Sequence, residues 1–189
     1  MPPKQKITKD MLLEHAFQIA EQQGIMAVTS RSVAKSVGCS IQPVFSQFPT
    51  MEELRQATFD YACNKFVNEV LAFEHQPDFL TQVTKWVLDL ARNRPKLFHL
   101  LYLSDGFNGR NLIEVMMGYE SNKRMISKMM ELYCLDENAC KNILLRGCLF
   151  LMGISTMICV NHMDFSNEQV AMMMKQTISD MVNGEREKL

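Results

Sequence analysis

Residues 29–54 read TSRSVAKSVGCSIQPVFSQFPTMEEL, and this stretch decides the fold of the chain. Thr29 is a residue type that caps a helix, and Gly38 supplies the left-handed turn that ends one. In a second short helix, Val44 and Phe48 lie four residues apart, so both face the first helix. The spacing predicts two small helices joined by a glycine-containing turn, which is a helix-turn-helix.

The second short helix turns a mostly polar side outward. Ser40 opens this helix, and its hydroxyl must cap the Gln42 amide because Pro43 has no N–H, unless the helix begins nearer Pro43. Either arrangement puts Gln42 and Pro43 at the front of the helix, the end that helix-turn-helix proteins insert into the major groove. Gln42 can then read adenine through its side-chain amide. The alternative is that Gln42 and Gln47 are ordinary solvated residues.

A third helix follows directly. Pro49 ends the second helix, and Thr50 with Glu53 has the Thr-x-x-Glu spacing of a capping box. Two short helices bury too little surface alone, so they need support from a preceding amphipathic helix, which Thr8 caps and Gly24 ends. The supporting side chains of that helix are Leu13, Ala16, Phe17 and Ala20.

These signals form one linear pattern over the first quarter of the chain. The pattern consists of Gly24, Thr29-x-Arg31-x-Val33-Ala34, Gly38-x-Ser40 and Val44-Phe45-x-x-Phe48-Pro49-Thr50-x-Glu52-Glu53-Leu54. With the helix that precedes it, from Ile7, the pattern resembles the tetracycline-repressor (TetR) family of bacterial transcription regulators. The resemblance implies a DNA-binding domain at residues 1–48 and a helical regulatory, ligand-binding and dimerisation domain at residues 49–189. It also implies a repressor that binds a palindromic operator and is released by a small-molecule ligand.

The residues expected to meet double-stranded DNA lie at the ends of the helix-turn-helix and on the outer side of its second helix. They are Thr29, Arg31, Ser40, Ile41, Gln42, Pro43, Phe45, Ser46, Gln47 and Thr50. Phe45 stands where the family usually has tyrosine, which removes a hydroxyl that would reach a phosphate, although the ring can still pack. Met51 stands where a lysine is common. Both departures weaken the expected contacts with the DNA backbone.

Composition is that of a folded soluble protein, with 47% apolar and 22% charged residues. The net charge of -1 does not by itself indicate a nucleic-acid-binding protein, because phosphate contacts normally require lysine and arginine. Up to Gln47 the chain has five basic and three acidic residues, a small positive excess. Part of that excess lies at residues 1–6, which read either as a frayed terminus or as a basic arm that touches phosphate.

Helical periodicity continues through the rest of the chain, and no run of useful length alternates with period two. Met51–Phe73 reads as one long helix that begins in the DNA-binding domain and continues beyond it, so it is the natural mechanical link. The other predicted helices are Phe79–Arg92, a short helix around residues 97–101, Asn111–Tyr133, Asp136–Asn161 and Ser166–Asn183, with a loop at Ser104–Asn111. We therefore predict an all-α fold, with an N-terminal three-helix DNA-binding domain followed by a helical bundle.

The last two helices are predicted to form a homodimer. The segment Gly147–Val160 is apolar nearly all round, so its own bundle can cover only one side and a second subunit is the simplest cover for the other. The last helix offers a matching stripe, made of Val170, Met174, Thr177, Ile178 and Met181. The family resemblance implies the same arrangement.

A ligand pocket is predicted where aromatic, polar and methionine side chains mix. The candidate residues are Trp86, Phe98, His99, Tyr102, Phe107, Met116 and Tyr119, which suit an apolar or amphipathic small molecule. The chain has 16 methionines, a residue that suits adaptable pockets, but ordinary core packing is the simpler reading of any one of them.

An enzyme is not expected, because no catalytic or phosphate-binding motif is found and the four histidines are scattered without metal-ligand spacing. No cofactor or metal is predicted. The six cysteines include no CxxC pair and read as reduced cytosolic thiols, and Gly147–Val160 is too short for a bilayer span, so the expectation is a cytoplasmic protein without a membrane helix. Two alternatives remain: an all-helical small-molecule-binding protein that no longer binds DNA tightly, and a small helical enzyme.

Overall fold

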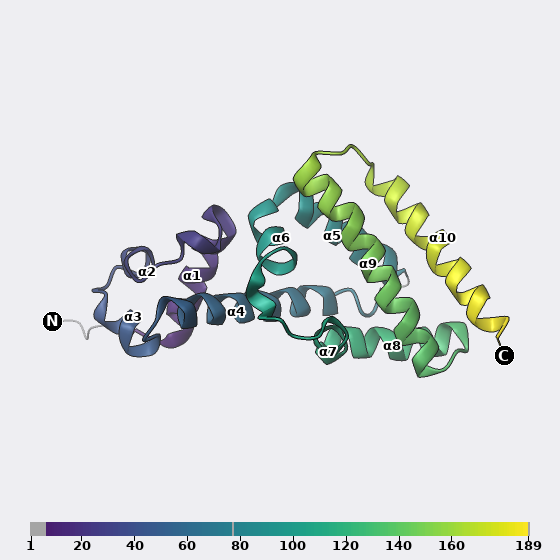
Figure 1. Cartoon of the computed structure of the whole chain (residues 1–189), viewed down its shortest axis with the longest axis horizontal. Helices are drawn as coiled ribbons and strands as arrows, with labels where there is room; N and C mark the ends of the chain where they lie inside the picture. Colours follow the sequence, from purple (N-terminus) through teal and green to yellow (C-terminus); the bar gives the residue numbers. More distant parts are fainter. Residues whose placement is uncertain (1–6, 77, 189) are drawn as a thin grey trace. The chain divides into compact units, whose positions relative to one another are not determined.

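The computed structural model describes residues 7–76 and 78–188, and over these residues the protein is all-helical (Figure 1). The predicted all-α fold is therefore confirmed. The α-helices are α1 (Lys9–Gln23), α2 (Ser30–Val37), α3 (Gln42–Gln47), α4 (Met51–Leu71), α5 (Phe79–Asn93), α6 (Pro95–Tyr102), α7 (Leu112–Gly118), α8 (Glu120–Tyr133), α9 (Glu137–Asn161) and α10 (Asn167–Arg186). Two short 3-10 turns, η1 (Ile25–Ala27) and η2 (Asp105–Phe107), complete this part of the chain. The arm at residues 1–6 lies outside the described residues.

The helix ends predicted at Thr8, Gly24 and Thr50 are confirmed. The Thr8 hydroxyl accepts a hydrogen bond from the Met11 N–H at 3.2 Å, and α1 ends at Gly24, whose φ is 92°. The Thr50 hydroxyl accepts from the Glu53 N–H at 3.1 Å and starts α4. Each cap satisfies a backbone group that the helix end would otherwise leave without a partner.

The predicted single helix Asn111–Tyr133 is wrong, because the structure divides it into α7 and α8. The chain is extended at Tyr119, with ψ 131°, directly after Gly118. Glycine is a poor helix former, and the Asn122 side chain donates to the Met116 carbonyl at 2.7 Å, which satisfies an acceptor at the end of α7. Periodicity alone missed this break because the apolar stripe continues across it.

The described chain divides into two compact units. Unit 1 holds the residues up to Lys65 together with Arg94–Gly106, and unit 2 holds Phe66–Asn93 and the residues from Phe107 onward. Helix α4 is continuous and contributes residues to both units. The predicted division into residues 1–48 and 49–189 concerns function, and it stays a prediction.

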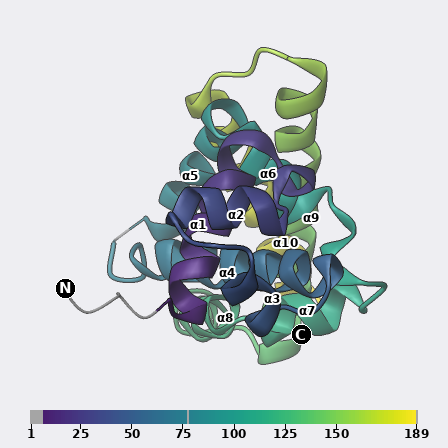
Figure 2. The ribbon, with the colours of Figure 1, turned by 90° about the vertical axis from the view of Figure 1, so that its left-hand side faces the viewer.

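Unit 1 is built around α1, which packs against α2 and α6 (Figure 2). All four predicted supporting side chains are buried, with Ala16 and Ala20 at 0%, Phe17 at 4% and Leu13 at 9% exposure. The other apolar core residues at 0% exposure come from α1, the segment before α2, α2, α3, α4 and α6; they are Leu12, Val28, Val33, Val44, Leu54 and Phe98. The three short N-terminal helices therefore share one apolar core, as the sequence predicted.

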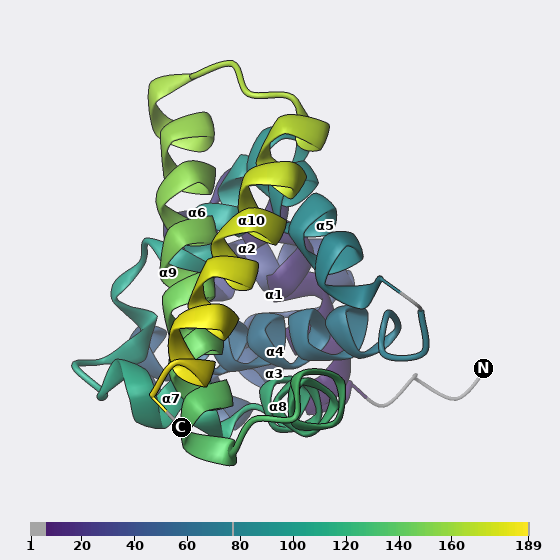
Figure 3. The ribbon, with the colours of Figure 1, turned by 90° about the vertical axis from the view of Figure 1, so that its right-hand side faces the viewer.

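Unit 2 is built around α9, which packs against α5, α8 and α10 (Figure 3). The stripe predicted to meet a second subunit from the last helix faces this core instead. Its apolar members are buried inside the unit, with Val170 at 0%, Met174 at 7%, Ile178 at 8% and Met181 at 7% exposure. The prediction of α10 as a free apolar surface is wrong along this stripe, because α10 needs it to pack on α9 and α5.

Helix α9 keeps an exposed apolar side. Leu149 is 46%, Met157 40% and Val160 56% exposed. Of the helices in the described part of the chain, α9 is the one long and apolar enough to cross a membrane by length and composition alone. The core helices of soluble proteins are often as long and as apolar, so this property is weak evidence for a membrane span.

Candidate nucleic-acid interface

Helix α2 is held by a reciprocal cap. The Thr29 hydroxyl accepts from the Ser32 N–H at 3.0 Å, and the Ser32 side chain accepts from the Thr29 N–H at 2.9 Å. The helix ends at Gly38, whose φ of 79° is left-handed and whose N–H bonds to the Ala34 carbonyl at 3.0 Å. Only glycine adopts this conformation without strain, so the turn between α2 and α3 is set by Gly38.

Helix α3 begins at Gln42, with Ile41 in the capping position and no side-chain cap. Of the two predicted arrangements, the structure has the second: the helix begins next to Pro43, and the Ser40 hydroxyl does not cap it. Gln42 and Pro43 nevertheless stand at its front end, as predicted. Proline suits this position because a first-turn N–H has no partner inside the helix.

The apolar residues in and next to α3 differ sharply in burial. Val44 is 0% and Phe48 2% exposed, so both face the core as predicted. Ile41 and Phe45 are each 46% exposed. The Phe45 ring is only partly buried, because the inward positions are filled by Val44 and Phe48.

Most of the residues expected to meet DNA are open to solvent. The exposed ones are Arg31, Ser40, Ile41, Gln42, Phe45, Ser46, Gln47 and Thr50, whereas Thr29 and Pro43 are half-buried. The Thr29 hydroxyl already serves the α2 cap, and the Ser46 hydroxyl donates to the Pro43 carbonyl at 2.9 Å. DNA contact by all ten residues stays a prediction.

The charge of this surface is locally positive. Residues 29–51 contain two cations, Arg31 and Lys35, and no acidic residue, which makes a net charge of +2. Both side chains are exposed, and neither has an ion-pair partner among the residues that the structure describes. Two unpaired cations on α2 are available for phosphate, although they are few for a DNA-binding protein.

Helix α4 is tied to the segment in front of α2 by contacts that the sequence did not reveal. The Arg55 guanidinium donates to the Val28 carbonyl at 3.3 Å and to the Met26 carbonyl at 3.4 Å. The buried Ser30 hydroxyl donates to the Met51 sulfur at 3.6 Å. Met51 therefore has a packing role, which explains why this position need not hold lysine.

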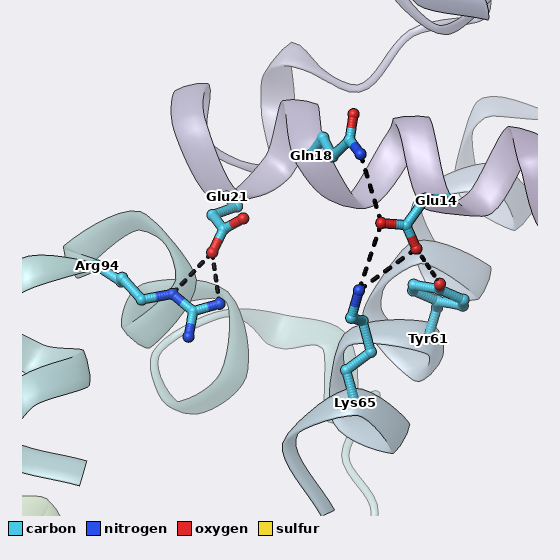
Figure 4. Close-up of polar contacts among 6 residues, drawn as sticks. All are labelled: Glu14, Gln18, Glu21, Tyr61, Lys65 and Arg94. Carbon is cyan, nitrogen blue, oxygen red and sulfur yellow. Dashed lines mark hydrogen bonds and ion pairs between the residues drawn. The ribbon is translucent and has the colours of Figure 1, made fainter. Parts of the chain in front are cut away.

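A polar cluster ties α1 to α4 within unit 1 (Figure 4). The Tyr61 hydroxyl donates a short hydrogen bond to the Glu14 carboxylate, and the Lys65 ammonium lies 3.3 Å from the same carboxylate. The hydrogen bond from Tyr61 lowers the pKa of Glu14, and it raises the pKa of Tyr61 to about 12. Nothing in the sequence shows that α1 brings a carboxylate to the Tyr61 hydroxyl, because the two residues are 47 positions apart.

A second ion pair ties α1 to α6 (Figure 4). The Arg94 Nε atom lies 2.7 Å from the Glu21 carboxylate, and both side chains are about one-third exposed. Arg94 precedes Pro95, so it fixes the start of α6 against α1. The helix that supports α2 and α3 is thus held by one charged contact near its middle and another near its end.

We expect Tyr61→Phe to lower the free energy of unfolding by roughly 1 kcal/mol at neutral pH. A hydrogen bond to a charged group contributes about 1.5–3 kcal/mol when it is buried, and solvent weakens this one because the Glu14 carboxylate is partly exposed. The lowered Glu14 pKa means that this stabilisation is present above the unfolded carboxyl pKa and is lost as the pH falls through the folded value, below 4.5. Urea denaturation of the wild type and of Tyr61→Phe, at pH 7 and at acid pH, measures the difference in unfolding free energy at each pH.

The matched control is Tyr133→Phe. The Tyr133 hydroxyl has no hydrogen-bond partner in the part of the chain that the structure describes, so its removal should change the unfolding free energy little at either pH. A Tyr61→Phe loss that is equal at neutral and acid pH would show that the Glu14 charge does not contribute.

The seven residues predicted to surround a ligand belong to both units. Phe98, His99 and Tyr102 lie on α6 in unit 1, where the Phe98 and Tyr102 ring centroids are 5.0 Å apart. The other four, in unit 2, are Trp86, Phe107, Met116 and Tyr119. Trp86 packs against Phe66, with centroids 5.0 Å apart. That all seven contact one ligand stays a prediction.

Unit 2 contains a groove of about 450 Å³ that none of these seven residues lines. Its walls come from the first turns of α5, the end of α8 and one side of α10. Phe79, Met174 and Ile178 supply apolar wall, and Lys175 and Arg186 supply positive charge. The sequence does not reveal this groove, because its residues come from three helices far apart in the chain.

Metal ligation finds no support among the described residues, where no group of three or more histidine, cysteine or acidic side chains gathers. The described cysteines are all free thiols. Burial raises the pKa of the thiols of Cys140 and Cys159, which keeps them protonated and poorly reactive.

Comparison with solved structures shows a likeness in fold. The chain is similar to the crystal structure of the multidrug binding protein EbrR complexed with imidazole, with a TM-score of 0.55 and 13% sequence identity over 92% of this chain and 96% of that chain. No family model matches the sequence. No curated protein matches it either. The likeness covers nearly the whole of both chains, and it supports the all-helical TetR-like fold.

Proposed function

We propose that the protein is a ligand-responsive transcription regulator, which binds double-stranded DNA through α2 and α3 and works in the cytoplasm. The observation that carries the proposal is α3 itself. Its inner side is buried by Val44 and Phe48, while Gln42, Ser46 and Gln47 are exposed on a short helix held after a glycine turn. The overall likeness to EbrR, which is described as a multidrug binding protein, supports the ligand-responsive part.

The proposed DNA site is a palindromic operator bound by a homodimer, with each α3 in the major groove. Gln42 reads adenine, while Thr29, Ser40 and Thr50 contact phosphate together with Arg31. Because the local charge is only +2, we expect a shallower dependence of affinity on salt than a strongly basic protein shows.

Gln42→Ala tests this assignment. We expect it to weaken binding to a duplex selected from a random library roughly tenfold or more, and to leave non-specific binding unchanged, because amide contacts to a base edge are worth about 1–3 kcal/mol. Fluorescence anisotropy measures the affinity for the selected duplex and the affinity for a duplex of unrelated sequence. Gln22→Ala, which removes an exposed amide from α1, is the matched control and should change neither affinity. Equal losses on both duplexes with Gln42→Ala would contradict base reading.

The homodimer is proposed to form through the exposed apolar side of α9. Leu149, Met157 and Val160 are large apolar residues on this side, and each is at least 40% exposed. Helix α10 adds Met172 and Met173, at 74% and 44% exposure. A second copy is the cover we propose for this surface, since a dimer places two copies of α3 at successive major grooves about 34 Å apart.

The effector is proposed to be an apolar or amphipathic small molecule that relieves repression. It must bind one arrangement of the dimer better than the other, and by linkage the selected DNA must weaken ligand binding by the same factor. A thermal-shift screen of amphipathic compounds identifies a ligand through the rise in melting temperature. Its affinity, measured by calorimetry with and without the selected duplex, should then differ by about 5- to 150-fold. Equal affinities would contradict coupling.

Two variants locate the effector once it is found. Trp86→Ala removes one of the seven predicted residues, and Ser179→Trp places a large ring in the groove of unit 2 from an exposed position. Loss of ligand binding in Trp86→Ala alone supports the predicted residues. Loss in Ser179→Trp alone assigns the ligand to the groove instead.

A second function is favoured by one observation: α3 carries no charged residue, and residues 29–51 contain only two cations. This charge is what we would expect of a small-molecule-binding protein that no longer binds DNA tightly. Failure to enrich any duplex from the library, together with a positive ligand screen, would support this alternative.

A further inference from the structure

Helix α3 presents an apolar pair to solvent beside its packed face, since positions 41, 44, 45 and 48 follow one another along the same stripe. Ile41 and Phe45 are four residues apart, so their side chains lie together one helical turn apart. Each is 46% exposed, although the core positions of the same short helix are filled by Val44 and Phe48. Isolated exposed apolar residues are ordinary, but an adjacent pair on a surface that is otherwise amide and hydroxyl indicates a contact made on binding.

The neighbouring side chains restrict what this surface can recognise. Residues 40–47 contain no arginine or lysine, so the usual two-bond contact with guanine is not available from α3. The glutamine amides of Gln42 and Gln47 match adenine instead. Adenine pairs with thymine, whose C5-methyl is the apolar group on the major-groove edge of an A·T pair.

We propose that Ile41 and Phe45 read thymine through contacts with its methyl groups, so that the half-site under α3 is composed of A·T pairs. Amide and apolar side chains on one helix side then recognise the two bases of the same kind of pair. This inference rests on the proposed function, since it requires α3 to enter the major groove. It gives Phe45 a role that does not depend on a hydroxyl.

Replacing thymine by deoxyuridine tests the proposal, because it removes the methyl group and leaves the pairing unchanged. The probe is the duplex selected from the random library, synthesised once with thymine and once with deoxyuridine in the half-sites. We expect the wild-type protein to bind the deoxyuridine duplex about fourfold more weakly for each methyl group that it buries. Ile41→Ala and Phe45→Ala should bind the thymine duplex more weakly and show a smaller difference between the two duplexes.

Met26→Ala is the matched control, because Met26 is an apolar residue of unit 1 outside α3 with 72% exposure. It should keep the full difference between the duplexes. Circular dichroism melting verifies that each variant remains folded, as expected for changes at exposed side chains.

The outcomes separate this inference from the proposed function. Enrichment of no duplex would refute DNA binding itself. A selected duplex that binds equally well with deoxyuridine, or one with G·C pairs throughout the half-site, would overturn thymine reading while DNA binding stands. A methyl effect that persists unchanged in both Ile41→Ala and Phe45→Ala would also overturn it, since other residues would then contact the methyl groups.

Discussion

Gly106→Ala is expected to lower the free energy of unfolding by about 2 kcal/mol, because the new methyl group has no space. A Cβ at this position would lie 2.4 Å from Cδ2 and 2.6 Å from Cγ of the Phe59 ring. The ring cannot move aside easily, since Phe59 is only 2% exposed. The turn is also held in place, because the Gln56 amide donates to the Gly106 carbonyl at 3.1 Å.

Urea denaturation measures this loss, and Gly118→Ala is the matched control. A Cβ at Gly118 would meet nothing within 4 Å, so alanine there should not destabilise the protein. Adding Phe59→Leu to Gly106→Ala should recover part of the loss, since the smaller side chain relieves the overlap. If Gly106→Ala and Gly118→Ala had the same stability, the close approach to Phe59 would not be the reason for glycine.

Leu149→Glu is expected to dissociate the proposed dimer. A carboxylate without a partner in a dry interface costs about 3 kcal/mol or more, which corresponds to roughly a hundredfold rise in the dimer Kd. Leu149 is 46% exposed, so the change should leave the fold of unit 2 intact. Sedimentation velocity at micromolar concentration measures the change, and loss of the dimer should also weaken binding to a palindromic duplex.

The matched control is Leu132→Glu on α8. Leu132 is 63% exposed and lies outside the α9 surface, so this variant should sediment as the wild-type protein does. A wild-type protein that is monomeric at the same concentration would contradict the dimer. Ile154 would be a poor choice for this test despite its place in the apolar segment, because it is 7% exposed and a charge there would unfold unit 2.

Sequence alone determined the features that depend on residues close together in the chain. Thr8, Thr29 and Thr50 each cap a helix through an amide three residues away, and Gly38 ends α2 by adopting the left-handed conformation that it favours. Helical periodicity located the remaining helices, apart from the break at Tyr119. These properties are local, because a cap or a turn is satisfied within one helical turn.

The tertiary structure decided which apolar and polar positions find partners. Periodicity marks the apolar stripe of α10, but only packing shows that α9 and α5 cover it and that Leu149 stays exposed. In the same way, Tyr61 bonds to Glu14, and Gly106 lies against the Phe59 ring, although the two partners of each pair are 47 residues apart in the sequence. The proposed DNA-binding surface likewise depends partly on local sequence and partly on tertiary packing. Sequence placed Gln42 at the front of α3, whereas the exposure of Ile41 and Phe45 depended on Val44 and Phe48 filling the core, since burial is a property of the whole packed unit.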